Sequence, residues 1–306
     1  MAAPEPNAID FTIGSRRLLS VPRRLSTWNF GLEDVLSGAL PDAPPAGRDG
    51  VRVLSVPTSR LPDIAATFPG LIAGGRQDYR RHFIDMRQSF DDYLAQFSGK
   101  TRSTLRRKAR KLADDAGGYS ITEHRTPAEI EAFLTAALPL SARTYQARLL
   151  DAGLPDSPAA KRMMLQTAEA GRMRAFLLHA NDQPIAYLSL PVMGSEKGPT
   201  LVYAHLGYDP AWARLSVGTV LQMNALERLF AERRYSWFDF TEGEGAHKEL
   251  FGTGHAACSS VVLLEPTLAN RTLLFARARF DTSVAQAKAL AARSGALGRI
   301  RTLLRA

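Results

Sequence analysis

The sequence contains little cysteine and lacks any long apolar run. Cys258 is the only cysteine in 306 residues, so no internal disulfide can form and a reducing compartment is compatible with the sequence. No stretch approaches the roughly 18 consecutive apolar residues of a membrane span. Residues 1–10 also lack a basic segment followed by an apolar one. From these absences we expect a soluble, cytoplasmic protein.

Several well-known catalytic and metal-binding patterns are also missing. The six histidines show no H-E-x-x-H or Cys/His ligand spacing, and no G-x-S-x-G sequence occurs. Gly99-Lys100-Thr101 looks like the end of a phosphate-binding P-loop, but Leu94 stands where the first glycine would be. The sequence therefore predicts neither a metal site nor a nucleoside triphosphatase.

The formal net charge of +9 is concentrated in two segments. Seven basic residues and no acid lie between Lys100 and Lys111, and residues 268–306 hold eight basic residues against one acid, Asp281. Either segment is suited to an anionic partner. In the tail, arginines alternate with Leu297, Ile300, Leu303 and Leu304. Two interpretations stay open for this stripe: peripheral contact with an anionic inner membrane, or packing on the body of the protein, which we prefer.

Hydrophobic periodicity predicts an α/β protein with a mixed (α+β) sheet. A helix is expected at 93–113, with an apolar stripe beneath the basic residues. Before residue 88 the patterns are weak, with strands expected at 9–13 and 51–56. The further expected elements are strands at 119–124, 173–180, 184–192, 200–208, 236–240 and 258–264, and helices at 127–150, 161–170 and 217–234. We divide the chain into a partial N-terminal subdomain (1–92), a main domain (93–266) and a basic helical tail (267–306).

Three short motifs, taken in their order along the chain, indicate a family resemblance. They are the basic helix at 100–107, Gly207-Tyr208-Asp209-Pro210 leading to Ser216-Val217-Gly218, and Phe238-Asp239-Phe240 followed by residues 247–252, His-Lys-Glu-Leu-Phe-Gly. In this order they make residues 93–265 resemble the GNAT superfamily of acyltransferases, in the group of CelD-like and FemAB-type proteins. The resemblance implies a GNAT-like fold, preceded by a partial GNAT-like subdomain.

The expected donor site lies at the start of the predicted helix at 217. An acyl-CoA carries a pyrophosphate, which the free N–H groups of a helix N-terminus can bind. The usual family loop has glycine three residues after its Gln or Arg, whereas this chain has Val217 three residues after Arg214. Acetyl-CoA, another acyl-CoA, aminoacyl-tRNA and an acyl-carrier protein all stay open as donors, and a plain serine-capped helix is the alternative. The candidate donor-binding residues are Arg214, Ser216, Val217, Gly218 and Thr219.

Acyl transfer to an amine or hydroxyl needs a proton acceptor and a donor for the oxyanion. In the family, the strands corresponding to 201–206 and 237–240 splay apart around the acyl arm of the donor. Lys248 matches the lysine that FemAB-like proteins carry before a Phe-Gly pair, and we expect it to neutralise negative charge or hold an anionic acceptor. The base is expected among Glu242, Glu244 and His247, and Asp239 is a further catalytic candidate.

Structural roles compete with these assignments. Asp239 is also suited to capping a neighbouring backbone group, and Glu242 with Glu244 to a solvated loop. Tyr208 is a candidate acid for the leaving thiol and Tyr203 for substrate contact, although tyrosines on strands are often core residues. Arg102 and Arg106 are candidates for binding a substrate phosphate, or simply for a solvated helix face.

The leading hypothesis is an N- or O-acyltransferase that uses acyl-CoA and acts by direct attack on the thioester. Resemblance to CelD-like proteins implies a small-molecule or glycan-precursor acceptor, such as a sugar of a surface polysaccharide. One alternative is a FemAB-like aminoacyl transferase that uses charged tRNA. Another is a non-catalytic GNAT-like module of a polysaccharide synthesis complex.

Overall fold

The computed structural model describes residues 8–13, 16–144, 153–196, 198–243 and 245–293. The chain forms two compact units that interleave along the sequence. One comprises Met1–Phe30, Gly38–Asp78 and Cys258–Ala306, and the other Gly31–Ser37 and Tyr79–Ala257. Strands β5 (Ile72–Asp85) and β12 (Gly254–Leu264) each contribute residues to both units. The expected boundaries at 92 and 266 follow sequence order, whereas the compact units follow pairing between distant strands.

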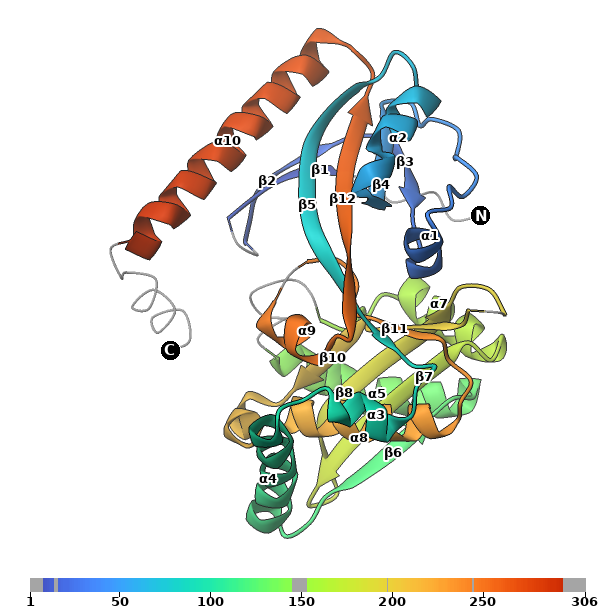
Figure 1. Ribbon diagram of the computed structural model, residues 1–306, viewed down its shortest axis with the longest axis vertical. Helices are drawn as coiled ribbons and strands as arrows, with labels where there is room; N and C mark the ends of the chain where they lie inside the picture. Colours follow the sequence, from blue (N-terminus) through green and yellow to red (C-terminus); the bar gives the residue numbers. More distant parts are fainter. Residues whose placement is uncertain (1–7, 14–15, 145–152, 197, 244, 294–306) are drawn as a thin grey trace. The chain divides into compact units, whose positions relative to one another are not determined.

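The first unit is built from short strands and one long helix. Its strand order is β3-β4-β12-β5, with a separate antiparallel hairpin of β1 and β2. Helix α10 (Leu268–Arg293), red in Figure 1, packs on β1, where the rings of Phe11 and Phe280 lie 5.4 Å apart between centroids. The described part of the expected basic tail is thus helical. The other elements are β1 (Ala8–Ile13), β2 (Arg16–Pro22), β3 (Leu25–Asn29), β4 (Gly50–Pro57), a 3₁₀ turn (Thr58–Arg60) and α2 (Leu61–Thr67).

The second unit is organised around a mixed sheet with the order β5-β11-β9-β8-β7-β6. Strands β9 and β11 pair in parallel, β7 is antiparallel to β6 and β8, and β10 pairs with β8. The expected tight turn between β7 and β8 is present, with φ angles of 50° at Asn181 and 58° at Asp182. The strands are β6 (Ser120–His124), β7 (Met173–Ala180), β8 (Gln183–Met193), β9 (Thr200–Val202), β10 (His205–Tyr208) and β11 (Trp237–Asp239).

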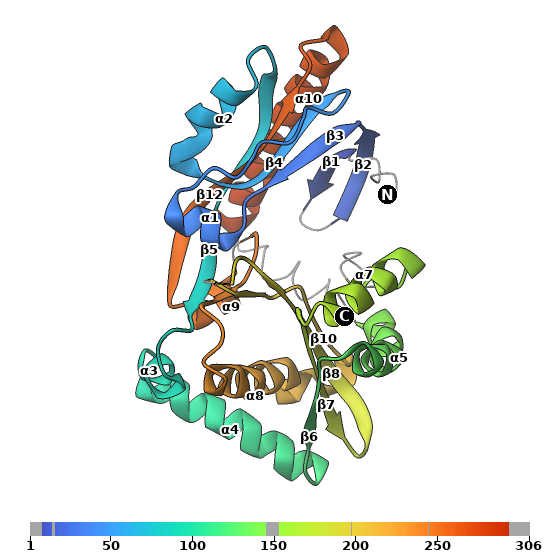
Figure 2. The same ribbon diagram turned by 90° about the vertical axis from the view of Figure 1, so that its right-hand side faces the viewer.

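Helices cover both faces of this sheet (Figure 2). On β7, Phe176 and Leu178 join the core with α4 and α8, while Ala175 and Leu177 join the core with α5 and α7. Burial on both faces explains the apolar run at residues 175–178 of β7 and confirms the predicted α/β class. The helices are α1 (Leu32–Ser37), α3 (Phe90–Ala95), α4 (Gly99–Ala116), α5 (Pro127–Arg143), α7 (Pro158–Glu169), a 3₁₀ segment (Pro210–Leu215), α8 (Val217–Ala231) and α9 (Ala246–Phe251).

The structure corrects three predicted elements. The helix expected at 93–113 is two helices, because Ser98 accepts a hydrogen bond from the N–H of Thr101 (3.1 Å) and starts α4 anew. The strand expected at 200–208 is divided into β9 and β10. The helix expected at 127–150 begins at its predicted Thr126 cap but ends at Arg143, and residues 145–152 lie outside the described residues. Strand β5 was not predicted, because its Gly-Gly pair and many charged residues hide any apolar alternation.

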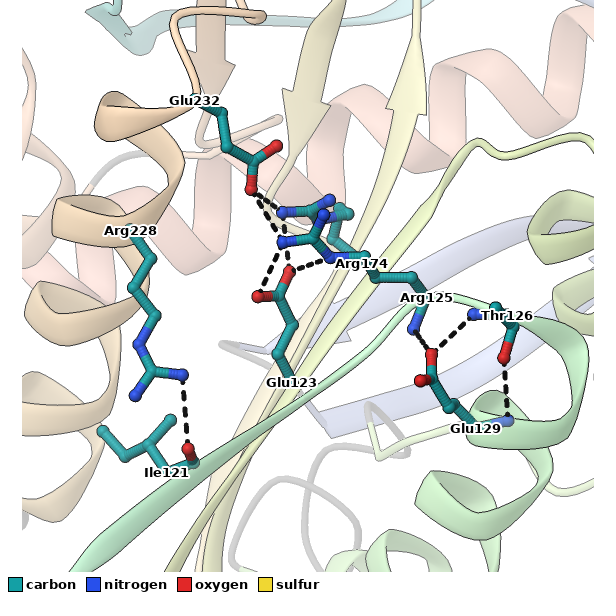
Figure 3. Close-up of polar contacts among 8 residues, drawn as sticks. All are labelled: Ile121, Glu123, Arg125, Thr126, Glu129, Arg174, Arg228 and Glu232. Atoms are coloured by element: carbon teal, nitrogen blue, oxygen red, sulfur yellow. Dashed lines mark hydrogen bonds and ion pairs between the residues drawn. The ribbon is translucent and has the colours of Figure 1, made fainter.

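A partly buried charge network fixes the edge of the second unit's sheet to α8 (Figure 3). Arg174 of β7 is almost fully buried and pairs with Glu123 of β6 (2.6 Å) and with Glu232 at the end of α8. Arg125 pairs with both carboxylates, at 2.7 Å to Glu123 and 3.0 Å to Glu232. Two cations and two anions therefore compensate each other where β6, β7 and α8 meet.

Gly207 in β10 is required by the packing of Tyr187. An added Cβ at this position would stand 2.4 Å from the Tyr187 ring. The ring is buried and held by its hydroxyl, which donates to Ser141 Oγ (3.0 Å). We expect Gly207→Ala to lower the free energy of unfolding by about 1–3 kcal/mol in chemical denaturation. Gly99→Ala is the control, because its Cβ meets no atom within 4 Å; equal stability of the two variants would contradict the packing argument.

Candidate functional site

Strands β9 and β11 pair only briefly before their chains separate. They are paired through Val202 and Asp239, and the N–H of Tyr203 donates to the Asp239 carbonyl (2.9 Å). After Tyr203 the chain enters β10, which pairs with β8, while the N–H of Phe240 donates to the carbonyl of His82 on β5 (3.1 Å). The two strands thus continue along different neighbours, and their pairing with each other ends at Tyr203.

Helix α8 begins next to this point without a side-chain cap. Ser216 has a left-handed backbone (φ 54°), and its side chain makes no capping hydrogen bond, unlike the serine cap considered from the sequence. The N–H groups of the first helical turn have no partner within a helix. Thr219 is half-buried and Arg214 is exposed, whereas the Val217 side chain is fully buried. The first turn of α8 therefore offers backbone donors, with a cation nearby in the sequence.

Gly218 serves packing between α8 and β10. An added Cβ would lie 2.9 Å from Leu206 Cδ2 and 3.2 Å from Tyr208 Cδ1. The sequence suggested that this glycine lets a phosphate approach the backbone closely. Instead, two side chains of the preceding strand fill the space beside it. The same contact places Tyr208 against the first turn of α8.

A buried ion pair anchors the end of β11. Arg81 of β5 donates to both carboxylate oxygens of Asp239, from Nε to Oδ1 (3.1 Å) and from Nη2 to Oδ2 (2.5 Å). The two side chains are only 8% and 1% exposed. Asp239 Oδ1 also accepts from the N–H of Thr241 (2.8 Å), whose φ of 62° turns the chain. Asp239 thus caps the backbone after its strand, as in the structural alternative, and we assign it a positioning role.

Lys248 on α9 lies against the loop that follows β11. Its Nζ donates to the backbone carbonyl of Glu242. Burial lowers the pKa of Lys248, and the charge of Arg81 adds to this lowering, while Asp239 and Glu242 oppose it. Glu242 is exposed, and Glu244 lies outside the described residues. The structure therefore brings Lys248, Asp239 and the loop after β11 together.

His247 connects α9 to α8. Its Nε2 lies 2.7 Å from Oε1 of Gln222, which is fully buried on α8 four residues after Gly218. His247 keeps an exposed surface, yet its ring packs on aromatic neighbours, with Phe251 at 4.7 Å and Tyr203 at 6.2 Å between centroids. The two candidates on α9 are thus adjacent to the start of α8.

The surroundings of His247 keep its imidazole neutral. Burial, followed by the positive charges of Lys108 and Lys248, lowers its pKa to about 4. Burial and the nearby Tyr208 raise the pKa of Tyr203, so that phenol stays protonated. Lys108 belongs to α4, which packs against α8.

A family model matches most of these elements. It describes an acetyltransferase (GNAT) domain and matches residues 99–249, which include α4, β9, β10, α8, β11 and the first part of α9. Residues 99–249 belong to the acetyltransferase (GNAT) domain family. Members of this family generally use acyl-CoA. A comparison with curated proteins finds no significant sequence match.

Solved structures share the fold of this chain at low sequence identity. The C-terminal domain of a candidate lysylphosphatidylglycerol synthetase from Agrobacterium fabrum is 15% identical, with a TM-score of 0.50 over 75% of this chain and 72% of that one. FemX is 12% identical, with a TM-score of 0.50 over 72% of this chain and 73% of that one. The expected relation to FemAB-type proteins is therefore confirmed at the level of fold.

The remaining predicted contacts lie on α4 of the GNAT domain. Arg106 is exposed, and Arg102 is half-buried with Nη1 3.5 Å from the carbonyl of Ala95. Within the described part of the chain, none of the seven basic side chains of α4 forms an ion pair. The helix therefore presents uncompensated positive charge.

Three residues of this cluster were not singled out from the sequence. Arg81 lies on the unpredicted strand β5, and Lys108 was one cation among seven. Gln222 did carry a signal, because it interrupts the apolar face that Leu221 and Ala225 form on α8. A polar side chain on a buried helix face normally has a bonded partner, which here is His247.

In the residues with assigned positions, no group of three or more His, Cys, Asp and Glu side chains is arranged to hold a metal ion. Among the described helices, none combines the length and apolar character of a membrane-crossing segment.

Proposed function

We propose that this chain is an N- or O-acyltransferase that transfers an acyl group from acyl-CoA to an amine or hydroxyl of a sugar or glycan precursor. One observation carries the proposal: the 2.7 Å contact between His247 and Gln222. It ties α9, with Lys248, to the first turns of α8 beside the point where β9 and β11 diverge. A donor site and groups able to act on the acyl carbonyl are thereby adjacent. The sugar acceptor rests on the resemblance to CelD-like proteins.

The residues of α8 fit the anionic part of such a donor. The uncapped N–H groups of Val217, Gly218 and Thr219 would hold the pyrophosphate, with Arg214 adding positive charge. The bound donor supplies a thioester, whose carbonyl carbon is electrophilic. Lys248 is placed to neutralise the charge that develops on the carbonyl oxygen or to hold an anionic acceptor. Tyr208, packed on Gly218, is the phenol available to protonate the leaving thiol.

A second candidate is aminoacyl transfer from charged tRNA. It is favoured by the unpaired basic side chains of α4, because lysine and arginine bind a phosphate backbone without reading its sequence. Helix α4 also packs against α8, which carries Gln222, the partner of His247. Binding of this kind weakens steeply as salt rises, since it releases counterions.

Thermal-shift measurements distinguish these functions. We expect acetyl-CoA or a longer acyl-CoA to stabilise the protein, and Arg214→Glu to weaken that effect. Arg271→Glu, an equal charge change at an exposed residue of α10, is the control. Stabilisation by tRNA alone, lost at high salt and on Arg106→Glu, would favour the second candidate. No response to either ligand would refute both and leave a non-catalytic module.

Turnover identifies the reaction itself. Release of free thiol from acyl-CoA is followed while amino sugars and neutral sugars are supplied as acceptors. We expect thiol release that depends on the acceptor, with product mass increased by one acyl group. Thiol release without an acylated product would show hydrolysis and contradict the proposed transfer.

A further inference from the structure

Gln222 is a polar side chain on the buried face of α8. It is fully buried in α8 among Val220, Leu221 and Ala225. Its Oε1 contacts His247 Nε2 at 2.7 Å, whereas its Nε2 is buried and has no hydrogen-bond partner among the described residues. Buried polar groups usually have partners, and one left half-bonded calls for a reason. The arrangement suggests that the bond to His247 is what this glutamine contributes.

The contact determines which ring nitrogen of His247 carries hydrogen. An amide oxygen only accepts hydrogen bonds, so His247 Nε2 must be the donor. A neutral imidazole has one N–H, and its other nitrogen keeps a lone pair. We propose that Gln222 holds His247 in the Nε2–H form, so that His247 Nδ1 is the general base that receives the proton of the attacking acceptor. This inference rests on the proposed acyl transfer.

The proposed step is balanced in atoms and charge. The acceptor nitrogen or oxygen bonds to the acyl carbon, and the carbon–sulfur bond of the thioester breaks. The acceptor proton moves to His247 Nδ1, and the leaving sulfur takes a proton from water or from Tyr208, whose phenolate then regains a proton from solvent. His247 then returns its proton to solvent through its exposed surface.

The groups around the ring keep Nδ1 available. Lys108 from α4 and Lys248 from α9 are the charged side chains that act on His247, and Tyr203 at the end of β9 is the other titratable group against it. Both cations disfavour the imidazolium, in addition to burial. The lone pair of Nδ1 is therefore free throughout the neutral range, and the base-dependent rate should fall only as the pH approaches about 4.

¹⁵N NMR tests the proposed tautomer of His247 and needs no measurement of enzyme activity. In protein labelled with ¹⁵N-histidine, long-range ¹H–¹⁵N correlations report which ring nitrogen is protonated, and His247→Asn identifies the signals. We expect Nε2 to carry the hydrogen at pH 7 and the ring to remain neutral at pH 5.5. A hydrogen on Nδ1 would overturn the proposal, whatever the activity.

Variants of Gln222 separate positioning from a purely structural role. Gln222→Met keeps the side-chain length but removes the acceptor, and we expect a mixture of tautomers and a kcat reduced by roughly 10-fold. Gln222→Glu keeps a hydrogen-bond acceptor for His247 and should therefore keep the Nε2–H form. Its added negative charge should raise the pKa of His247 and so move the acid limb of kcat/KM to higher pH. Asn224→Met on the same helix is the matched control and should change neither tautomer nor rate. Unchanged tautomer and rate in Gln222→Met would refute the positioning role.

His247→Ala tests the base directly. We expect kcat to fall by about 10²-fold, as is typical for loss of a general base, while acyl-CoA still stabilises the variant. Full turnover in this variant would refute the base and leave the acyltransferase function standing. Absence of turnover in the wild-type protein would instead refute the proposed function, with the NMR result still deciding the tautomer.

Discussion

Replacing Arg81 by alanine is expected to lower the free energy of unfolding by about 3–5 kcal/mol. The substitution leaves the Asp239 carboxylate buried at 1% exposure without its bidentate partner. A buried charge that loses its partner keeps its desolvation cost, which is far larger than the loss at a surface pair. The same change should loosen the turn at Thr241, which Asp239 caps, and with it the loop that leads to Lys248.

Denaturant unfolding of a double-mutant cycle measures this effect. Arg81→Ala, Asp239→Ala and the double variant should show strong coupling, with the double variant less destabilised than the sum of the single ones. Arg76→Ala removes one partner of the exposed pair with Asp78 and should change stability little. If Arg81→Ala unfolds at the same denaturant concentration as the Arg76 variant, the buried pair is not an anchor.

Replacing Lys248 by alanine is expected to reduce kcat by about 10²–10³-fold, the usual loss when a group that stabilises developing charge is removed. Lys248 is half-buried and donates to the Glu242 carbonyl, so its ammonium is held in a fixed position beside the end of β11. Binding of acyl-CoA should be nearly unchanged, because the donor's pyrophosphate is assigned to α8. The loss should therefore appear in kcat more than in the KM for the donor.

Lys111→Ala is the matched control for this variant. Lys111 is an exposed lysine of α4 and should be replaceable without loss of turnover. Lys248→Arg keeps the charge but changes its shape, so partial activity is expected. Equal kcat values for the wild-type protein and Lys248→Ala would remove Lys248 from the mechanism, and loss of the acyl-CoA thermal shift would make it a donor-binding residue.

Predictions from the sequence succeeded where the signal was local. Met173–Ala180 was predicted with its correct bounds, and the Thr126 cap correctly placed the start of α5. A run of apolar residues or a capping side chain acts on neighbours in the chain, so its effect can be read from a short window. Misplaced boundaries had local causes too, as with Ser98, whose capping bond starts a new helix.

The candidate site was only partly predictable. His247, Lys248 and the start of α8 were identified from motif and spacing, and the structure brings them together through Gln222. Gly218 was identified as important but for another reason, since its missing Cβ makes room for Leu206 and Tyr208. The role of a glycine depends on what occupies the space beside it, and neighbouring residues in the sequence do not reveal that.

The sequence by itself determined the fold class, the central strands, the helix that follows a Gly-Tyr-Asp-Pro turn, and the residue types of the reactive cluster. Tertiary structure alone decided that Arg81 neutralises Asp239, 158 residues away, and that Gln222 orients His247, 25 residues away. Local periodicity and capping depend on interactions within a few residues. Ion pairs, tautomers and pKa values depend on burial and on charges that only folding brings together.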